Sequence, residues 1–160
     1  MNITTRRLYY ALSFSLAAAL SVFLYYAYEM YGGLFWKITA RSSASPYDML
    51  KLFIVPVITF IFINEAIFRR CEYERQTALL LALTLPLAGI YSVLPRSFAP
   101  PIGACALALF FFVSYILSGK LCVRSAFSAA VTPLALIALL TLLIALGLSP
   151  PDTYFFIGVI

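Results

Sequence analysis

Residues 47–68 read YDMLKLFIVPVITFIFINEAIF, and this stretch decides how the chain folds. It contains only three charged residues, and none of them lies between Leu52 and Ile63. A helix that crosses the hydrocarbon core of a bilayer needs about 20 mostly apolar residues, and this run has 22. Its apolarity is nearly continuous, whereas a strand of a membrane barrel would alternate apolar and polar residues. The stretch therefore predicts a membrane-spanning α-helix.

Four further runs of the same character occur in the 160-residue chain. They cover residues 8–28, 77–94, 101–118 and 131–148, and the last extends back to Phe127 at most. The closing residues 149–160 begin with a serine and two prolines, Pro150 and Pro151, and are too few for another span. The sequence therefore predicts an all-α integral membrane bundle of about five transmembrane helices, which forms a single domain over residues 1–160.

The composition supports the same fold class and excludes several kinds of chemistry. Hydrophobic residues make up 64% of the chain and charged residues 11%, whereas soluble domains have about a quarter charged residues. The net charge of +5 comes from short basic clusters beside apolar runs, which is typical of topology signals rather than of nucleic acid binding. The chain has no histidine, so histidine-based acid–base catalysis is excluded. We expect no cofactor and no metal ion.

Lysine and arginine residues are unevenly divided between the two sides of the predicted membrane. Seven fall on the side of the N-terminus: Arg6, Arg7, Arg69, Arg70, Arg75, Lys120 and Arg124. Four fall on the other side: Lys37, Arg41, Lys51 and Arg96. Because cytoplasmic loops carry the excess of Lys and Arg, we expect the N-terminus in the cytoplasm. With five spans, the C-terminus is then expected outside.

Ionisable residues gather where the first run ends and the second begins. Glu29 ends the first run, and Asp48 and Lys51 open the second. Asp48 and Lys51 are three residues apart, a spacing at which side chains pair on one helix face. Charged residues within membranes commonly mark ligand or ion sites, so we predict a cup at the outer rim that includes Tyr28 and Tyr47 and binds a small polar or cationic ligand. The alternative is that these are interface residues whose polar ends reach water.

Glu65 lies near the other end of the second run and is the sixth candidate binding residue. It either contributes to a site or pairs with Arg69, which is four residues further along the same helix. The two readings stay open at this point.

Two prolines lie inside predicted spans, Pro56 in the second and Pro86 in the third. Each removes a backbone donor from its helix and predicts a kink. For Pro56, the carbonyl that loses its partner is that of Leu52.

Small residues recur every four positions on three of the predicted helices. On the fourth helix they form the pairs Ala104–Ala108 and Ser114–Ser118. The longer stripes are Ser13, Ala17 and Ser21 on the first helix and Thr84, Ala88 and Ser92 on the third. Lipid tails give apolar helices no hydrophobic reason to associate, and small residues let helix backbones approach closely instead. Both stripes are therefore expected to face other helices. Between the first two spans, residues 32–46 contain Trp36 and are expected to lie partly along the membrane surface.

The series Tyr28-Glu29, Gly32 and Ser45-Pro46-Tyr47-Asp48-Met49-Leu50-Lys51, followed by a proline and a glutamate, resembles an uncharacterised family of small bacterial multi-spanning membrane proteins. That family carries a Tyr-Glu-Trp-Ser-Gly segment after its first helix and a Ser-Val-Trp-Glu-His-Leu-Lys segment that opens its second. Here Tyr47 replaces the tryptophan, Asp48 the glutamate and Met49 the histidine. The resemblance implies a divergent member in the bacterial inner membrane, and it implies no established function.

These patterns leave three hypotheses for function. The leading one is a non-enzymatic protein that binds or transports a small polar solute at the rim residues. The first alternative is an accessory or assembly subunit that docks on a larger membrane partner through its small-residue stripes. A homo-oligomer is the other partner that we consider. The second alternative is a membrane-embedded enzyme, which the sequence disfavours because it contains no nucleophile motif and because nothing fixes Glu29 and Asp48 at a catalytic separation.

Overall fold

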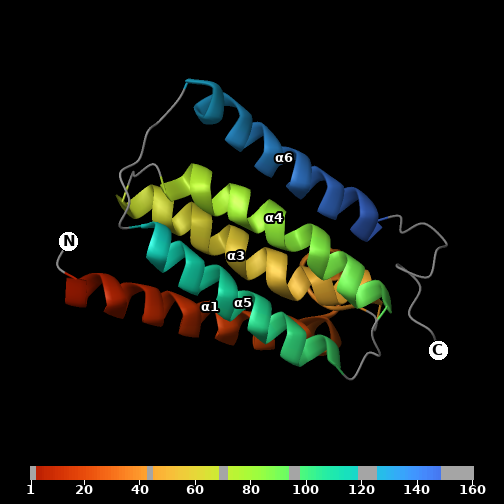
Figure 1. Cartoon of the computed structure of the whole chain (residues 1–160). Coiled ribbons are helices and arrows are strands. Elements are labelled where there is room, and N and C mark those ends of the chain that lie inside the picture. Colours follow the sequence, from red (N-terminus) through yellow and green to blue (C-terminus); the bar gives the residue numbers. More distant parts are fainter. Residues whose placement is uncertain (1–2, 43–44, 69–71, 94–97, 119–125, 149–160) are drawn as a thin grey trace.

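The computed structural model describes residues 3–42, 45–68, 72–93, 98–118 and 126–148. Within these ranges the chain forms six α-helices and no β-strand (Figure 1). They are α1 (Ile3–Tyr31), α2 (Leu34–Thr39), α3 (Pro46–Phe68), α4 (Glu72–Val93), α5 (Ala99–Leu117) and α6 (Ala126–Leu148). All except α2 are long and apolar enough to cross a membrane. The predicted all-α bundle with five candidate spans is confirmed.

Helices α1 and α4 begin earlier than the apolar runs within them. Helix α1 begins at Ile3 and α4 at Glu72, whereas the runs begin at Leu8 and Thr77. Hydropathy marks the part of a helix that lies in hydrocarbon, and backbone hydrogen bonds continue beyond it into the interface. Glu72 and Glu74 lie in the first turn of α4, where negative charge interacts favourably with the helix dipole. The closing residues 149–160 lie outside the described residues.

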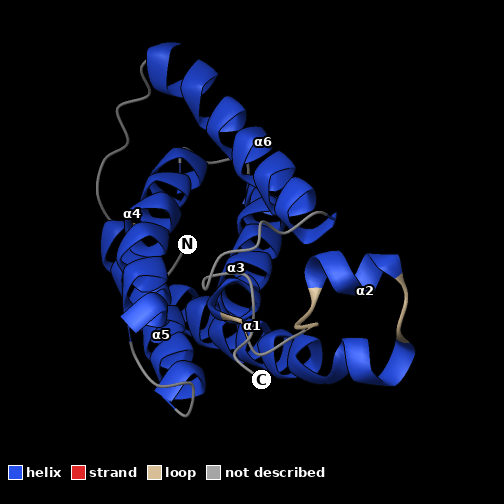
Figure 2. Ribbon diagram, turned by 90° about the vertical axis from the view of Figure 1, so that its right-hand side faces the viewer, coloured by secondary structure: helices blue, strands red, loops and turns tan. Residues whose placement is uncertain are grey.

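A tight turn separates α1 from the short helix α2. Gly32 and Gly33 have φ angles of 60° and 88°, which lie in the left-handed region that glycine adopts without a Cβ clash. The Gly32 amide donates to the Tyr28 carbonyl at 2.9 Å and closes the last turn of α1. After this turn the Trp36 ring stacks on Tyr31, with the ring centroids 5.6 Å apart. Helix α2 therefore lies against the end of α1 (Figure 2).

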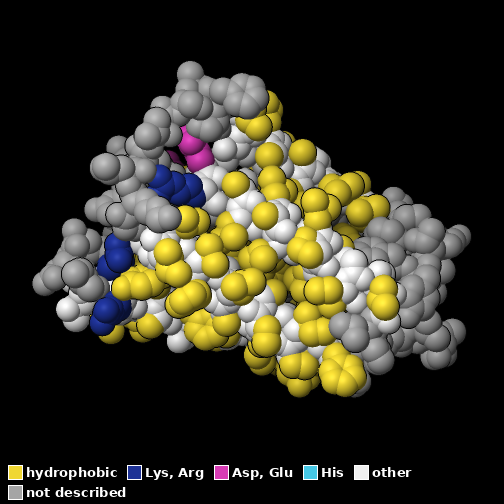
Figure 3. All heavy atoms as spheres, viewed as in Figure 1, with side chains coloured by type: hydrophobic (Ala, Val, Ile, Leu, Met, Phe, Trp, Pro, Cys, Tyr) yellow, Lys and Arg dark blue, Asp and Glu magenta, His cyan; other side chains and the backbone are white. Residues whose placement is uncertain are grey.

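Helix α3 is the centre of the bundle. Of its most apolar 18-residue window, 61% of the residues are buried, against at most 33% for any other candidate span. It packs against α1, α4 and α5, while α6 contacts α2 and α4 (Figures 1 and 2). On the face drawn in Figure 3, hydrophobic side chains cover the middle of the molecule, and Lys and Arg side chains gather at one end. This distribution fits a lipid-facing surface with a polar end.

Aromatic rings join α1, α3 and α5 at one end of the bundle. The Phe60 ring lies 4.7 Å from Phe111 and 6.2 Å from Tyr10, measured between ring centroids. Tyr10 also packs edge-on against Tyr115 at 5.8 Å, and Phe14 against Phe111 at 5.9 Å. Edge-to-face aromatic pairs add about 0.5–1.5 kcal/mol beyond the area that they bury. This aromatic cluster therefore holds α1 and α5 together over the first half of α1.

The small-residue stripe on α1 supplies the partner that Pro56 removes from α3. Helix α3 continues through Pro56, which has no N–H to donate to the Leu52 carbonyl. The Ser21 hydroxyl of α1 donates to that carbonyl oxygen at 2.8 Å. Ser13 and Ala17 are buried on the same stripe, as expected. The side chain of Ser21 therefore replaces, across the helix interface, a bond that lipid could not provide.

The stripe on α4 faces its neighbours only in part. Thr84 is buried, but Ser92 is exposed and its hydroxyl donates to the Gly89 carbonyl of its own helix at 2.7 Å. The expectation that this whole stripe faces other helices is wrong at Ser92. A hydroxyl can satisfy itself on its own helix, so a small polar residue does not require a neighbouring helix.

We expect Ser21→Ala to lower the free energy of unfolding by about 0.6–1.7 kcal/mol, that is, between the mean and the largest value measured for hydrogen bonds between membrane helices. The loss should be much smaller in a Pro56→Ala background, because an alanine at this position supplies its own N–H to the Leu52 carbonyl. Ser15→Ala is the matched control, since Ser15 is exposed and its hydroxyl bonds the Ala11 carbonyl of its own helix. Detergent-induced unfolding can be followed by the fluorescence of the only tryptophan, Trp36. Equal losses in both backgrounds would contradict this account.

Candidate functional site

The predicted rim residues lie around the start of α3, where the local sequence favours a helix N-terminus. Ser45 directly precedes the helix, and its hydroxyl accepts the Asp48 amide at 3.1 Å. Pro46 occupies the first helical position, where a missing N–H costs nothing. An acidic residue three positions after a capping serine completes the usual pattern of helix starts. The side chains of Asp48 and Lys51 are thereby fixed on the first turns of α3.

Asp48 and Lys51 form a buried ion pair. Their side chains are 4% and 1% exposed, and Lys51 Nζ lies 2.5 Å from Asp48 Oδ1. The second carboxylate oxygen, Asp48 Oδ2, accepts the Ser42 hydroxyl at 3.0 Å. Lys51 Nζ also donates to the Lys37 carbonyl at 2.9 Å and lies 4.7 Å from the centre of the Tyr47 ring. Both charges are therefore satisfied by the protein itself.

The ion pair has a structural consequence that follows from the position of Lys37. The Lys37 carbonyl belongs to the last turn of α2, where carbonyl groups have no partner within their own helix and a positive charge is favourable. Lys51 thus caps α2, while Ser42 is held by Asp48. The ion pair therefore holds α2 and Ser42, which follow α1 in the chain, against the start of α3.

The remaining rim residues lie in different surroundings. Glu29 is exposed on α1, so it does not share the buried environment of Asp48 and Lys51. Tyr28 is half-buried against the core. Tyr47 is buried, and its hydroxyl donates to the Leu143 carbonyl of α6 at 2.6 Å. The structure thus brings Tyr47, Asp48 and Lys51 together and leaves Glu29 at the surface.

A second polar cluster lies at the opposite end of α3. Asn64 Nδ2 donates to the side-chain oxygen Gln76 Oε1 at 3.0 Å and to Glu72 Oε2 at 3.5 Å, and Asn64 Oδ1 accepts the Tyr9 hydroxyl at 3.0 Å. The Tyr10 hydroxyl donates to Glu72 Oε2 at 3.0 Å. We refer to Tyr9, Tyr10, Asn64, Glu72 and Gln76 as the Asn64 network. It links α1, α3 and α4.

Glu65 lies beside the Asn64 network. Glu65 is half-buried, and its Oε2 atom is buried with no hydrogen-bond partner among the described residues. The predicted partner Arg69 lies outside the described residues. At this position, as at the rim, the polar residues of α3 lie close to the ends of the helix.

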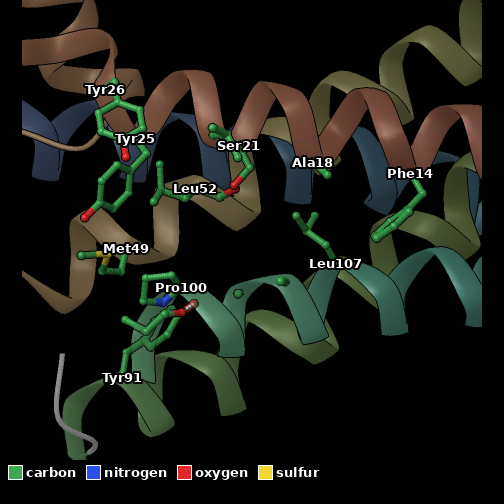
Figure 4. A pocket seen from close by; sticks show the side chains of 14 residues that line it. Phe14, Ala18, Ser21, Tyr25, Tyr26, Met49, Leu52, Tyr91, Pro100 and Leu107 are labelled. Carbon is green, nitrogen blue, oxygen red and sulfur yellow. Dashed lines mark hydrogen bonds between the residues drawn. The ribbon is translucent and has the colours of Figure 1, made fainter. Parts of the chain in front are cut away.

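A groove that the sequence did not indicate lies between α1 and α5. It has a volume of about 390 Å³, within the range of about 300–1,000 Å³ that is usual for small-molecule sites. Residues of α1 and α5 form its walls, α3 contributes Met49 and Leu52, and α4 contributes Tyr91 (Figure 4). The walls are largely apolar, and Ala18, Gly103 and Ala104 leave the space between the two helices open.

The two ends of the groove differ in chemistry. Phe14 and Leu107 lie at one end and Tyr25, Tyr26 and Tyr91 at the other (Figure 4). The end with Phe14 and Leu107 adjoins the aromatic cluster, because Phe14 packs on Phe111. At the tyrosine end, the Arg41 guanidinium lies 4.3 Å from the centre of the Tyr25 ring. The groove therefore has an apolar end and a tyrosine-rich end, and Arg41 packs on Tyr25, one of the tyrosines at that second end.

Glycine at position 103 leaves room for the side chain of Tyr91 from α4. A Cβ atom there would lie 2.9 Å from the Tyr91 hydroxyl oxygen, which donates to the Ala99 carbonyl at 3.2 Å. Tyr91 is thereby held against the first turn of α5. The small residues Ala18, Gly103 and Ala104 are the signal in the sequence that could have indicated the groove. The sequence pattern does not show which helices face each other, so the signal could not be interpreted.

No model of a known protein family matches the chain, and neither a curated protein nor a solved structure matches it. The resemblance to the family of small bacterial membrane proteins stays a prediction.

We expect Lys51→Met to destabilise the protein by about 3–5 kcal/mol, because it leaves the Asp48 carboxylate buried without its cation. Asp48→Asn should also destabilise, since it leaves the Lys51 ammonium buried without its carboxylate. The double variant should cost clearly less than the sum, since both charges are then removed. Unfolding in detergent, followed by Trp36 fluorescence, measures all three. Fully additive losses would contradict a stabilising interaction between these two charges.

Proposed function

We propose that this chain is a multi-spanning protein of the bacterial inner membrane that binds one membrane amphiphile in the groove between α1 and α5. The ligand would carry a hydrocarbon chain and an anionic headgroup. The observation that carries the proposal is the difference between the two ends of the groove, which runs from Phe14 and Leu107 to Tyr25, the ring on which the Arg41 guanidinium packs. A hydrocarbon chain matches the first end and a phosphate or carboxylate matches the second.

The position of the groove supports entry from the lipid. The groove lies between two helices that are each apolar enough to span a membrane, and Val22 and Tyr26 on its wall are exposed. An amphiphile in a bilayer leaflet already has its chain parallel to such helices, so it loses little orientational freedom on binding. Under the predicted orientation the tyrosine-rich end, with Arg41 beside it, faces the outer leaflet.

The groove supports an amphiphile better than the rim charges support a polar solute. Asp48 and Lys51 are paired within the protein and Glu29 is exposed. To bind there, a polar solute would have to break these internal bonds. Only the difference in free energy between its own bonds and the broken ones would favour binding. The hydrocarbon chain of an amphiphile instead fills an existing space.

Occupation of the groove can be tested with a pair of adjacent alanines on α1. Ala18 lines the groove, whereas Ala19 is exposed and does not. We expect Ala18→Leu to abolish the retention of one phosphatidylglycerol molecule, because the larger side chain fills the space, and Ala19→Leu to leave retention unchanged. Native mass spectrometry after release from phosphatidylglycerol-containing micelles counts the retained lipid. Ala104→Leu, on the facing wall, provides a second blocking variant.

Retention that is equal in the Ala18 and Ala19 variants would overturn the groove as the site. A stoichiometric protein retained in place of lipid, and lost in Ala18→Leu, would instead support the accessory-subunit hypothesis. The fluorescence of Trp36 in each variant reports whether the bundle has kept its fold.

Headgroup recognition can be tested at Arg41. We expect Arg41→Gln to reduce the preference for phosphatidylglycerol over phosphatidylcholine of the same chain length by about fivefold, since one basic residue near anionic lipid contributes about 1 kcal/mol. Arg7→Gln is the matched control, because Arg7 lies near the start of α1 and bonds the Tyr115 hydroxyl away from the groove. The ratio of the two lipids retained from an equimolar mixture is the measurement. An unchanged ratio in Arg41→Gln would contradict the assignment of the headgroup to this end.

A further inference from the structure

Two buried polar atoms between α4 and α5 lack a hydrogen-bond partner among the described residues. They are Gln76 Nε2 and Ser114 Oγ, and each residue is only 3% exposed. More than about nine in ten buried polar groups in folded proteins have a partner in the protein or in ordered water. An orphaned amide donor inside a membrane protein is costly, so a partner for both atoms is expected.

The orientation of the Gln76 amide is fixed by its other end. Gln76 Oε1 accepts the Asn64 Nδ2 donor at 3.0 Å, as part of the Asn64 network. The NH₂ group of Gln76 is therefore the end that is left to donate elsewhere. A flip of this amide would place two NH₂ groups opposite each other and break the bond to Asn64.

Gln76 and Ser114 line the same small cavity. The space in it that is open to the centre of a water molecule is about 10 Å³, which is close to the least that holds a single water. Other lining residues already have partners, since Arg75 donates to the Leu117 carbonyl at 2.9 Å and Glu72 accepts the Tyr10 hydroxyl. The cavity therefore lies between two helices, has a mostly apolar lining that includes the residues of the two unpartnered atoms, and is sized for one small molecule.

The donors around the cavity select among small ligands. The unused group of Gln76 is a donor, which disfavours a cation, and the Glu72 carboxylate on the same wall disfavours an anion. Ser114 can either donate or accept. A neutral molecule that both accepts and donates is required.

We propose that one water molecule is bound in this cavity, where it accepts a hydrogen bond from Gln76 Nε2 and forms a second with Ser114 Oγ. This water extends the Asn64 network from α4 to α5. The resulting chain of hydrogen bonds runs from Tyr9 through Asn64, Gln76 and the water to Ser114, and it joins α1, α3, α4 and α5 at one end of the bundle.

The experiment exploits the fact that Gln76 is the only glutamine in the chain. Labelling the protein with glutamine that carries ¹⁵N in its side-chain amide gives one nitrogen resonance, that of Gln76 Nε2, in nuclear magnetic resonance spectra recorded in detergent micelles. We expect a direct dipolar cross-peak between the Gln76 Nε2 protons and a proton at the water frequency. Its sign in the rotating frame separates a bound water from chemical exchange.

Variants of Ser114 make the test specific. Ser114→Val should abolish the cross-peak, because the second methyl group takes the place of the water, and Ser114→Ala should weaken it severalfold, because the water loses a partner. Ser92→Ala is the matched control on α4, since that serine is exposed and bonds within its own helix; it should leave the cross-peak unchanged.

A cross-peak to the Ser114 hydroxyl proton in place of water would overturn the proposal, as it would show a direct bond between the two side chains. A protected Gln76 amide with no cross-peak to water would also overturn it. A cross-peak that is equally strong in wild type and in Ser114→Val would place the water elsewhere and would likewise contradict the assignment.

Discussion

Helix α3 has polar side chains near both of its ends, inside a largely apolar bundle. The arrangement of the other helices depends on the hydrogen bonds that these side chains require. Hydrocarbon supplies no hydrogen-bond partners, so Asp48 and Lys51 at one end and Asn64 at the other must find partners in the protein. They do so with Ser42 and α2 at the first end and with α1 and α4 at the second. Leaving a buried polar group without a partner costs more free energy than one hydrogen bond contributes. These contacts therefore restrict where the neighbouring helices can lie.

Pro56 shows how far the sequence predicts such contacts. The rule that proline orphans the carbonyl one turn earlier identifies Leu52, and the four-residue period identifies Ser21 as a small residue that faces another helix. The two predictions are separate in the sequence. Their connection through the Ser21 hydroxyl at 2.8 Å depends on the relative height of α1 and α3 in the bundle, which no local pattern specifies.

Among the rim residues, the sequence predicts the contact within one helix but not the contact between two helices. Spacing along the helix correctly indicates that Asp48 and Lys51 can pair, because three residues along a helix is a local relation. Whether Glu29 joins them depends on how α1 is rotated about its axis, and the structure leaves Glu29 exposed. Likewise, hydropathy finds five spans because length and apolarity are properties of each segment alone. It cannot find a groove, since a groove is a relation between two segments.

The groove itself follows from unequal packing along one pair of helices. At one end, Phe14 and Phe111 hold α1 and α5 together through their rings. Toward the other end the facing residues are Ala18, Gly103 and Ala104, which are too small to fill the space between helices that aromatic rings have set apart. A rigid aromatic contact at one end and small residues toward the other therefore account for the opening between the two helices. In water such an opening would expose apolar surface at a cost, but in a bilayer hydrocarbon chains surround it, so the stability of the bundle does not oppose keeping it open.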